Sequence, residues 1–344
     1  MKAFVVEKDY SWSVKDVSEP KLNPFTAKVK TLGCAVCGSD AKILHGTLKG
    51  TPSSMYPLVM GHEAVGEVVE TGERVTSFKV GDKVLCPYNF GLDGYGSAWG
   101  AFAEYGTVFD IHAEGAEALG PVAGRLGQRQ TIVPEYIDPL EATVMITLRE
   151  TLGACRRFRM DANESVAVYG LGPVGISFIK FLSLRGLKPI IGVSNSQSKL
   201  DQGLAAGADF VVNASDPQKR EKILDIAPKG LDHVLDAAGI TDIYNEAMGI
   251  LKEDGQIAAY GVPGDQSMTL DWSGNSHYNF ILNFYQMSDV GLDYWASNQV
   301  NALVKSGDVV LSDYVEGYFP FSDICDVMDR FLRKEYKKKV VIKF

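Results

Sequence analysis

Two clusters of potential metal ligands lie early in the chain. Cys34 and Cys37 are separated by two residues, and the pair His62-Glu63 follows in a second glycine-flanked segment. Thiolate, imidazole and carboxylate groups are all able to ligate zinc. Taken alone, the cysteines are also compatible with a redox pair or half of a structural zinc site, and an isolated His-Glu pair is common on surfaces. Together, and upstream of a nucleotide-binding motif, they are a far more specific signal than either cluster alone.

That nucleotide motif is the segment Gly170-Leu-Gly-Pro-Val-Gly175, which directly follows a hydrophobic stretch, 165–169, and opens an expected helix. Gly170 would permit a tight turn, Gly172 would let the backbone approach a pyrophosphate, and Gly175 would allow close packing of helix on strand. The alternative is a glycine-rich turn without a ligand. The expected cofactor-binding residues here are Gly170, Gly172, Pro173, Val174 and Gly175.

The end of the next expected strand indicates which dinucleotide binds. An acidic residue about 20 residues after the glycines would bind the adenosine ribose hydroxyls. This chain has instead Ser194, Asn195, Ser196 and Lys199. Small hydroxyl and amide groups with a nearby lysine can bind a 2′-phosphate, which a carboxylate would repel. The sequence therefore favours NADP over NAD, although these residues also fit a simple helix start with Ser194 or Ser196 as N-cap.

Composition narrows the class of protein. The chain has 344 residues, 46% hydrophobic and 22% charged, which excludes a disordered, collagenous or disulfide-stapled protein. A net charge of -9 argues against nucleic acid or an anionic membrane as partner and favours a small ligand. No apolar run reaches the roughly 18 residues of a membrane span. Five scattered cysteines fit free thiols in a reducing compartment, so we expect a cytoplasmic protein.

The pattern of elements changes near residue 150 to 160. Before it, short β-branched runs broken by Gly and Pro predict a β-rich, barrel-like unit. After it, strands and helices alternate, which predicts a doubly wound parallel sheet of five strands and an α/β fold. Residues 114–129 read as an irregular loop, and a terminal helix at 322–334 precedes a strand at 339–344 that returns to the first domain. The five expected strands are 165–169, 189–193, 210–213, 233–235 and 256–260.

Four segments carry a family resemblance: CGSD at 37–40, GHEAVGEVVETGERVTSFKVGDKV at 61–84, LGACRR at 152–157 and YGLGPVGI at 169–176. The chain resembles the zinc-type medium-chain alcohol and polyol dehydrogenases, most of all the sorbitol and galactitol-phosphate dehydrogenase branch. That resemblance implies a GroES-like catalytic domain, an inserted Rossmann domain and active-site zinc in the cleft between them. The corresponding boundaries are residues 1–152, completed by 286–344, and residues 153–285. Relatives are commonly homodimers or homotetramers that assemble through Rossmann-domain edge strands.

The same resemblance implies roles for five residues. Cys37 and His62 would be zinc ligands, and Glu63 would be a close neighbour able to bind or release the metal. Ser39 matches the hydroxyl that hydrogen-bonds the substrate oxygen and starts a proton relay. Asp40 matches the carboxylate that orients His62, a role expected beside a ligating imidazole.

Two departures from the family pattern affect metal binding. Members with a structural zinc have four closely spaced cysteines after the GDKV segment, whereas this chain has only Cys86, so a structural zinc is not expected. The Glu or Cys that usually completes the catalytic site falls on Ile146, and the neighbouring Thr147 cannot replace an anionic ligand. Cys37, His62 and Glu63 with a water still suffice for a catalytic zinc. A shifted alignment would bring Glu141 or Glu150 into reach, unless both are solvated helix charges.

Other residues near the first motif are candidates for catalysis or for lining the pocket. Lys42 falls where many relatives have a relay histidine, and it would pass protons if its pKa were depressed; an exposed structural lysine is the alternative. His45 is an alternative relay group or substrate contact, or else a surface histidine in a turn. Trp99, Trp272, Tyr278 and Trp295 are candidates for a cleft wall, but so many aromatics are more often core and receive no assigned role.

The sequence thus supports three functions. The first is a zinc-dependent NAD(P) oxidoreductase that transfers a hydride between nicotinamide and a secondary alcohol or ketone, such as a polyol or sugar derivative. The second is a zinc-independent reductase of the same fold, in which Ser39, Lys42 or a water chain protonates the product. The third is a nucleotide-binding relative without turnover. Metal analysis separates the first two, and cofactor oxidation with polyols and ketoses separates both from the third.

Overall fold

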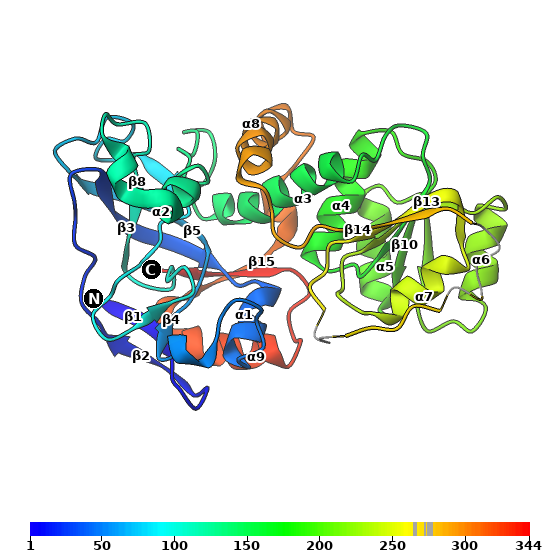
Figure 1. Cartoon of the computed structure of the whole chain (residues 1–344), viewed down its shortest axis with the longest axis horizontal. Coiled ribbons are helices and arrows are strands. Elements are labelled where there is room, and N and C mark those ends of the chain that lie inside the picture. Colours follow the sequence, from blue (N-terminus) through cyan, green and yellow to red (C-terminus); the bar gives the residue numbers. More distant parts are fainter. Residues whose placement is uncertain (264–266, 272, 274–277) are drawn as a thin grey trace. The chain divides into compact units, whose positions relative to one another are not determined.

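The chain folds into two compact units, seen in a computed structural model that describes residues 1–263, 267–271, 273 and 278–344 (Figure 1). The first unit comprises residues 1–149 and 293–344, and the second comprises residues 150–292. The chain enters the second unit within helix α3 (Met145–Arg157) and leaves it within α8 (Val290–Ser306). The expected domain boundaries at residues 152 and 286 stay a prediction, because compactness alone does not define an independently folding domain.

The second unit is built on a six-stranded parallel sheet in the order β11-β10-β9-β12-β13-β14. This is the strand order of a doubly wound dinucleotide-binding fold, so the predicted α/β class is confirmed. Its strands are β9 (Val166–Tyr169), β10 (Ile190–Ser194), β11 (Phe210–Asn213), β12 (Leu231–Asp236), β13 (Leu251–Ala259) and β14 (Phe280–Phe284).

The number of strands predicted for this sheet, five, was wrong. The sixth strand, β14, lies at the sheet edge beside β13, and none of its five residues is fully buried. Such a strand lacks the continuous buried apolar run that identifies central strands such as β9 and β10. Its own residues, Phe-Ile-Leu-Asn-Phe, are mostly apolar and fit a strand, but the predicted alternation of strands and helices ended at residue 260.

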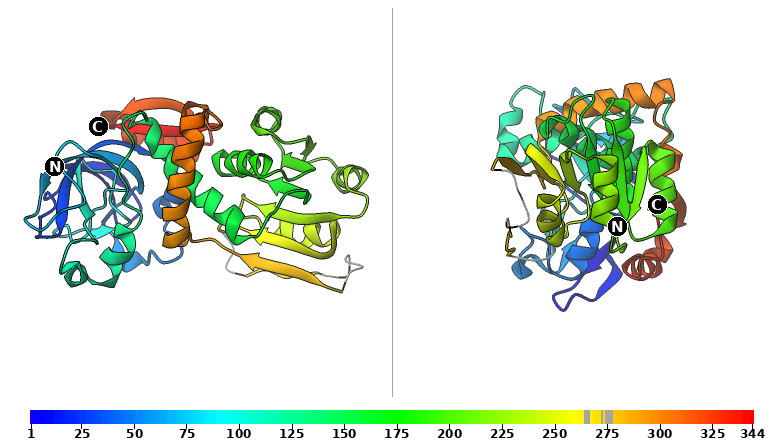
Figure 2. Two further views of the ribbon diagram at one scale, coloured as in Figure 1. Left: turned by 90° about the horizontal axis from the view of Figure 1, so that it is seen from above. Right: turned by 90° about the vertical axis from the view of Figure 1, so that its right-hand side faces the viewer.

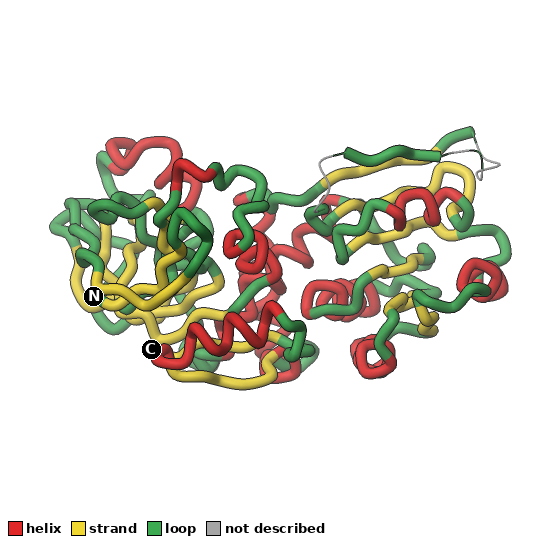
Figure 3. Tube along the Cα trace, turned by 90° about the horizontal axis from the view of Figure 1, so that it is seen from below, coloured by secondary structure: helices red, strands yellow, loops and turns green. Residues whose placement is uncertain are grey.

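Helices follow the strands of this sheet in alternation, as Figure 3 shows for the second unit. They are α4 (Pro173–Leu184), α5 (Gln197–Ala206), α6 (Lys219–Ile226) and α7 (Asp242–Met248). Apolar side chains from β9 to β13 and from α6 and α7 form one continuous core. The central strands β9 and β10 are fully buried and consist almost wholly of apolar residues, as expected for strands covered on both faces.

The first unit contains two further sheets. One has the order β2-β1-β4-β7, and the other has the order β15-β16-β3-β5-β6 with β8 paired to β3. The strands are β1 (Lys2–Val6), β2 (Trp12–Asp16), β3 (Thr26–Ala35), β4 (Leu58–Val59), β5 (Glu63–Thr71), β6 (Lys83–Leu85), β7 (Gly96–Ser97), β8 (Tyr105–Phe109), β15 (Val315–Pro320) and β16 (Lys339–Lys343).

The helices of the first unit are α1 (Gly38–Leu44), α2 (Gly120–Gly127) and α9 (Ile324–Leu332), besides the parts of α3 and α8. Short 3-10 turns lie at η1 (Ser53–Met55), η2 (Ala116–Leu119), η3 (Glu141–Val144), η4 (Leu311–Tyr314) and η5 (Phe321–Asp323). Residues 114–129, expected as an irregular loop, contain η2 and α2 instead. The proline in the first turn of α2 supports a helix start despite the glycines, because its fixed φ suits that position.

The last strand, β16, joins the sheet of the first unit by antiparallel pairing with β3, where Val341 lies opposite Ala35 and Ile342 opposite Cys34. Figure 2 shows this C-terminal segment in red beside the blue N-terminal strands. Val36 continues the pairing by donating its N–H to Val340 O at 2.9 Å. Residues at the two ends of the chain thereby build one sheet.

None of the helices in the described part of the chain has the length and apolar character that a membrane crossing requires.

Candidate active site

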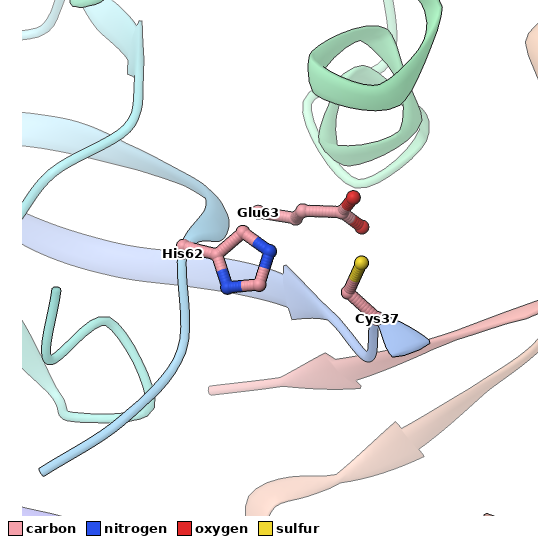
Figure 4. Close-up of side chains that lie close together, drawn as sticks. All are labelled: Cys37, His62 and Glu63. Carbon is pink, nitrogen blue, oxygen red and sulfur yellow. The ribbon is translucent and has the colours of Figure 1, made fainter. Parts of the chain in front are cut away.

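Three potential metal ligands converge in the first unit. Cys37 lies between the end of β3 and the start of α1, and His62 directly precedes Glu63, the first residue of β5. Strands β3 and β5 are paired so that Ala35 lies opposite Glu63, which brings the ends of both strands together. The ligand atoms of Cys37, His62 and Glu63 all lie within 4.8 Å of one another. Figure 4 shows the three side chains pointing toward a common point.

Gly61 makes the approach to this cluster possible. Its φ of +104° is a conformation that residues with side chains rarely adopt, and a Cβ there would lie 2.5 Å from the Phe102 ring. The chain therefore passes closely over Phe102 just before His62. Only glycine meets both requirements.

The Asp40 carboxylate ties the ligand-bearing segments together. Its Oδ2 accepts a hydrogen bond from the Cys37 N–H at 2.8 Å, and its Oδ1 lies 3.5 Å from His62 Nδ1. The second contact is longer than a well-formed hydrogen bond but close enough for electrostatic attraction. Ser39 Oγ lies 3.3 Å from His62 Nε2, the other ring nitrogen. Burial lowers the pKa of His62, but Asp40 and Cys37 more than offset that effect and hold the pKa well above its ordinary value.

Glu63 is held by two further residues. Thr147 donates a hydrogen bond from Oγ1 to Glu63 Oε1 at 2.6 Å, and the Lys339 ammonium pairs with Oε2. The Lys339 and Glu63 side chains are only 4% and 1% exposed. Burial lowers the pKa of Lys339, but the Glu63 carboxylate and the nearby Cys37 raise it above its ordinary value. Lys339 therefore stays charged beside the Glu63 side chain.

Lys339 is the site residue that the sequence analysis missed. It is 276 positions from Glu63, and a lysine at the start of a terminal strand normally points to solvent. Thr147 was considered only as a replacement ligand. In the structure it instead hydrogen-bonds a ligand, while Ile146 beside it is buried among apolar groups.

The residues present fit zinc. A thiolate, an imidazole and a carboxylate are the donor types that zinc takes in proteins, and a three-residue set leaves a position for water or substrate. In the ranges that the structure describes, this is the only group of three or more such side chains close enough to share an ion. Each Glu63 oxygen has one partner in the protein, Thr147 for Oε1 and Lys339 for Oε2, and a carboxylate oxygen can accept a second. Glu141 and Glu150 do not belong to the group; Glu150 accepts a hydrogen bond from Ser288 instead.

The remaining candidates around the first motif are not members of the three-residue ligand group. Lys42 is half-buried in the last turn of α1, and His45 caps that helix with an exposed side chain. Cys34 is fully buried in β3, where burial raises the pKa of its thiol well above the ordinary value. Cys86, the one cysteine in the stretch directly after the GDKV segment, is also buried, and its sulfur lies 3.0 Å from Arg149 Nη2. No disulfide joins any of the five cysteines.

The glycine turn of the second unit has the geometry of a dinucleotide-binding turn. Gly170 has a φ of +90°, and a Cβ there would lie 2.7 Å from Ala238 Cβ. A Cβ on Gly175 would lie 2.0 Å from Gly170 O, so α4 packs directly against the turn. Gly172, the N-cap of α4, faces open space, and Pro173 follows it in the first turn, before Val174. The exposed backbone N–H groups and the positive end of the helix dipole suit a phosphate.

The residues expected to choose between NAD and NADP lie where β10 ends. Ser194 is nearly buried as the last residue of β10, and Asn195 is exposed. Ser196 is the N-cap of α5 but makes no side-chain capping bond, while Lys199 lies in the first turn of that helix. A purely structural N-cap therefore does not explain Ser196.

Of the aromatic residues, Trp99 lies beside His62, with ring centroids 5.0 Å apart. Trp295 is part of α8 and Tyr278 is exposed, while Trp272 lies outside the described residues.

A doubly wound sheet with a glycine-rich phosphate turn, in one chain with a Cys-His-Glu centre, defines a nucleotide-dependent oxidoreductase of the metal-containing type. Comparison with known families agrees. Residues 23–113 match the family described as "Alcohol dehydrogenase GroES-like domain", and residues 173–281 match "Zinc-binding dehydrogenase". The chain belongs to the medium-chain zinc-binding alcohol dehydrogenase family, as its motifs suggested.

Named relatives support the same class. The NADP-dependent isopropanol dehydrogenase of Thermoanaerobacter brockii is 31% identical over 77% of this chain and 78% of its own length. A sorbitol dehydrogenase of Halalkalibacterium halodurans is 28% identical over 73% of each chain. The solved structure of galactitol-1-phosphate dehydrogenase from Escherichia coli has the same fold, with a TM-score of 0.81 at 18% identity over the full length of both chains.

The Glu63–Lys339 pair yields a test of stability. In the metal-free protein, Lys339→Met leaves the Glu63 charge buried without its cation, so we expect a loss of about 3 kcal/mol in the free energy of unfolding. The double variant Glu63→Gln, Lys339→Met removes both charges and should lose less than the sum of the two single changes. Urea unfolding monitored by circular dichroism measures the free energy of unfolding of Glu63→Gln, of Lys339→Met and of the double variant.

Lys343→Met, an exposed lysine on the same strand, is the matched control and should change stability by less than about 0.5 kcal/mol. Strict additivity of the Glu63 and Lys339 changes would show that the two charges do not stabilise each other.

Proposed function

We propose that the protein transfers a hydride between a nicotinamide cofactor and a secondary alcohol or its ketone, with a polyol or sugar derivative as substrate. The observation that carries this proposal is the convergence of Cys37, His62 and Glu63 in a chain with a dinucleotide turn. Isopropanol and sorbitol, which name two relatives, both carry secondary hydroxyl groups.

In this proposal Cys37 and His62 hold a catalytic zinc, with Glu63 as an exchangeable third ligand. When bound, zinc supplies a Lewis acid for the substrate oxygen, and the nicotinamide supplies or accepts the hydride. Asp40 keeps the His62 ring oriented through its contact with Nδ1, which leaves Nε2 for the metal. Lys339 pairs with Glu63 Oε2 and would hold that carboxylate in place beside the metal.

Proton movement falls to residues on α1. Ser39 Oγ, 3.3 Å from His62 Nε2, is placed to hydrogen-bond a substrate oxygen that enters beside the imidazole. Lys42 and His45 follow on the same short helix, and the exposed His45 reaches water. We assign Ser39 the first position of a relay to solvent, with Lys42 and His45 as the later groups.

The glycine turn would bind the cofactor pyrophosphate, and the end of β10 would bind the adenosine ribose. Ser194, Asn195 and Ser196 offer hydroxyl and amide groups there, and Lys199 offers a positive charge. No carboxylate stands in this segment to repel a 2′-phosphate. These features favour NADP.

The zinc-independent alternative draws on Ile146, which replaces the usual ligand. The donor chemistry of Cys37, His62 and Glu63, with Asp40 placed to orient the imidazole, favours the zinc-dependent reaction. A non-catalytic role leaves the buried Asp40–His62 contact without a purpose.

Metal analysis tests the reaction type. Protein prepared with zinc should hold about one zinc per chain, and Cys37→Ala and His62→Ala should each lose both the zinc and the cofactor-dependent oxidation of polyols. Elemental analysis and NADPH absorbance over a polyol and ketose panel measure the two properties. Cys325→Ala, a partly buried cysteine on α9, should retain both.

A wild-type protein that stays free of zinc but still turns over would sink the Lewis-acid mechanism. Ser39, Lys42 and His45 would then be the proton donors of a zinc-independent reductase.

Cofactor choice has its own test. Ser194→Asp should lower kcat/KM for NADPH by about tenfold or more, which corresponds to about 1.4 kcal/mol, because the new carboxylate repels the 2′-phosphate. The value for NADH should fall much less or rise. Ser306→Asp adds the same charge at an exposed position on α8 and should leave the ratio unchanged. A wild-type protein that prefers NADH would contradict the assignment.

We further propose that the protein is a homodimer or homotetramer assembled through β14. This strand is the edge of the six-stranded sheet, and its Ile281 and Phe284 side chains are 54% and 45% exposed. An open edge with apolar side chains favours pairing with a second copy. We also place the protein in the cytoplasm, since all five cysteines are free thiols.

Light scattering coupled to size exclusion tests the assembly. Ile281→Asp should shift the mass of the wild-type oligomer toward the monomer, because a buried charge opposes pairing at the edge. Ile132→Asp changes an exposed isoleucine of the first unit and should leave the mass unchanged. A monomeric wild type at micromolar concentration would refute assembly through this edge.

A further inference from the structure

Trp99 has an unusual backbone conformation next to the metal cluster. Its φ is +64°, in the left-handed region that residues with a Cβ rarely occupy. Gly100, which follows it, also has a positive φ of +74°. A bulky residue persists in this conformation only where the surrounding structure holds it, and such sites concentrate at functional centres.

Asn89 holds this turn from the core. Its backbone N–H donates to Trp99 O at 2.8 Å, and its side-chain Nδ2 donates to Gly100 O at 2.9 Å and to Tyr105 O at 2.6 Å. Ser97 Oγ donates in turn to Asn89 O. Asn89 is completely buried, so these hydrogen bonds are shielded from water. They fix the backbone on both sides of the indole.

The fixed indole lies against the imidazole of His62. The two ring centroids are 5.0 Å apart and the ring planes are inclined by 47°. Trp99 is only partly buried and packs on its other side against the apolar core of the first unit. Asp40 Oδ1 lies 3.5 Å from His62 Nδ1, and Ser39 Oγ lies 3.3 Å from His62 Nε2. The imidazole thus has polar groups near both ring nitrogens and the indole packed against it.

We propose that Trp99 is a positioning residue that holds the His62 ring in its metal-binding orientation, with Asn89 fixing the turn that presents it. The inference rests on the proposed metal site at Cys37, His62 and Glu63. Asp40 is 3.5 Å from Nδ1, too far for a strong hydrogen bond to fix the ring alone. An indole supplies the missing restraint through packing, and its ring face does not compete with the metal for Nε2.

Metal affinity tests the restraint. In a zinc titration against a chromophoric chelator, Trp99→Ala should weaken zinc binding by about 10- to 100-fold, the effect typical of groups that orient a ligating imidazole. Trp99→Phe keeps an aromatic ring and should stay within about threefold of wild type. Trp12→Ala is the matched control: it removes a tryptophan that packs on the same core but does not contact His62.

Fluorescence tests the placement without a destabilising change. Cobalt(II) quenches a nearby tryptophan, so adding it to the zinc-free wild type should lower the emission. Trp99→Phe should remove most of this quenching, and Trp12→Phe should retain it. This comparison decides the placement even if Trp99→Ala fails to fold.

The outcomes separate the two proposals. Wild-type protein that binds neither zinc nor cobalt contradicts the metal site and, with it, the role of Trp99. Wild-type protein that binds metal, with Trp99→Ala equal to Trp12→Ala in affinity or Trp99→Phe as strongly quenched as wild type, overturns the inference on Trp99 alone.

Discussion

Negative charge gathered out of water must be balanced, and the first unit is arranged to meet that requirement. The buried carboxyl groups of Asp40 and Glu63 lie beside Cys37 and His62, and an unpaired buried charge is strongly unfavourable. The Lys339 ammonium supplies one positive charge. A metal ion bound by Cys37, His62 and Glu63 would supply another. The antiparallel pairing of β16 with β3 is what carries Lys339 to the cluster, so the chemistry of the site depends on strands from both ends of the unit.

The chemistry of the site was largely predictable from local sequence, because ligand type and motif context are local properties. Cys37, His62 and Asp40 were identified from two short segments, and the structure brings them together. Lys339 was not predictable. Nothing in a lysine-rich terminal stretch distinguishes the one lysine that pairing turns inward, since that depends on register with a strand some three hundred residues earlier. The packing of Trp99 on His62 likewise follows from a turn held by tertiary hydrogen bonds.

The fold likewise contains elements that local sequence predicts and elements that depend on tertiary contacts. Strands β9 to β11 are short, nearly continuous runs of apolar residues, and this local pattern was sufficient to predict them as strands. The edge strand β14 has a largely apolar sequence but no fully buried residue, and its place in the sheet depends on its pairing with β13, which no local pattern reveals. Helix α2 contains three glycines, and glycine has a low intrinsic helix propensity. The segment is helical because tertiary packing overrides that propensity.

The sequence separation of Glu63 and Lys339 also orders events during synthesis. A ribosome adding about 5 to 20 residues per second needs roughly 14 to 55 s to pass from one to the other. During that interval the Cys37 thiol and the His62 imidazole have left the ribosome without the cation that balances them in the finished sheet. The whole second unit, residues 150–292, emerges within the same interval. A nascent chain therefore has its doubly wound sheet available to fold before Lys339 can pair with Glu63.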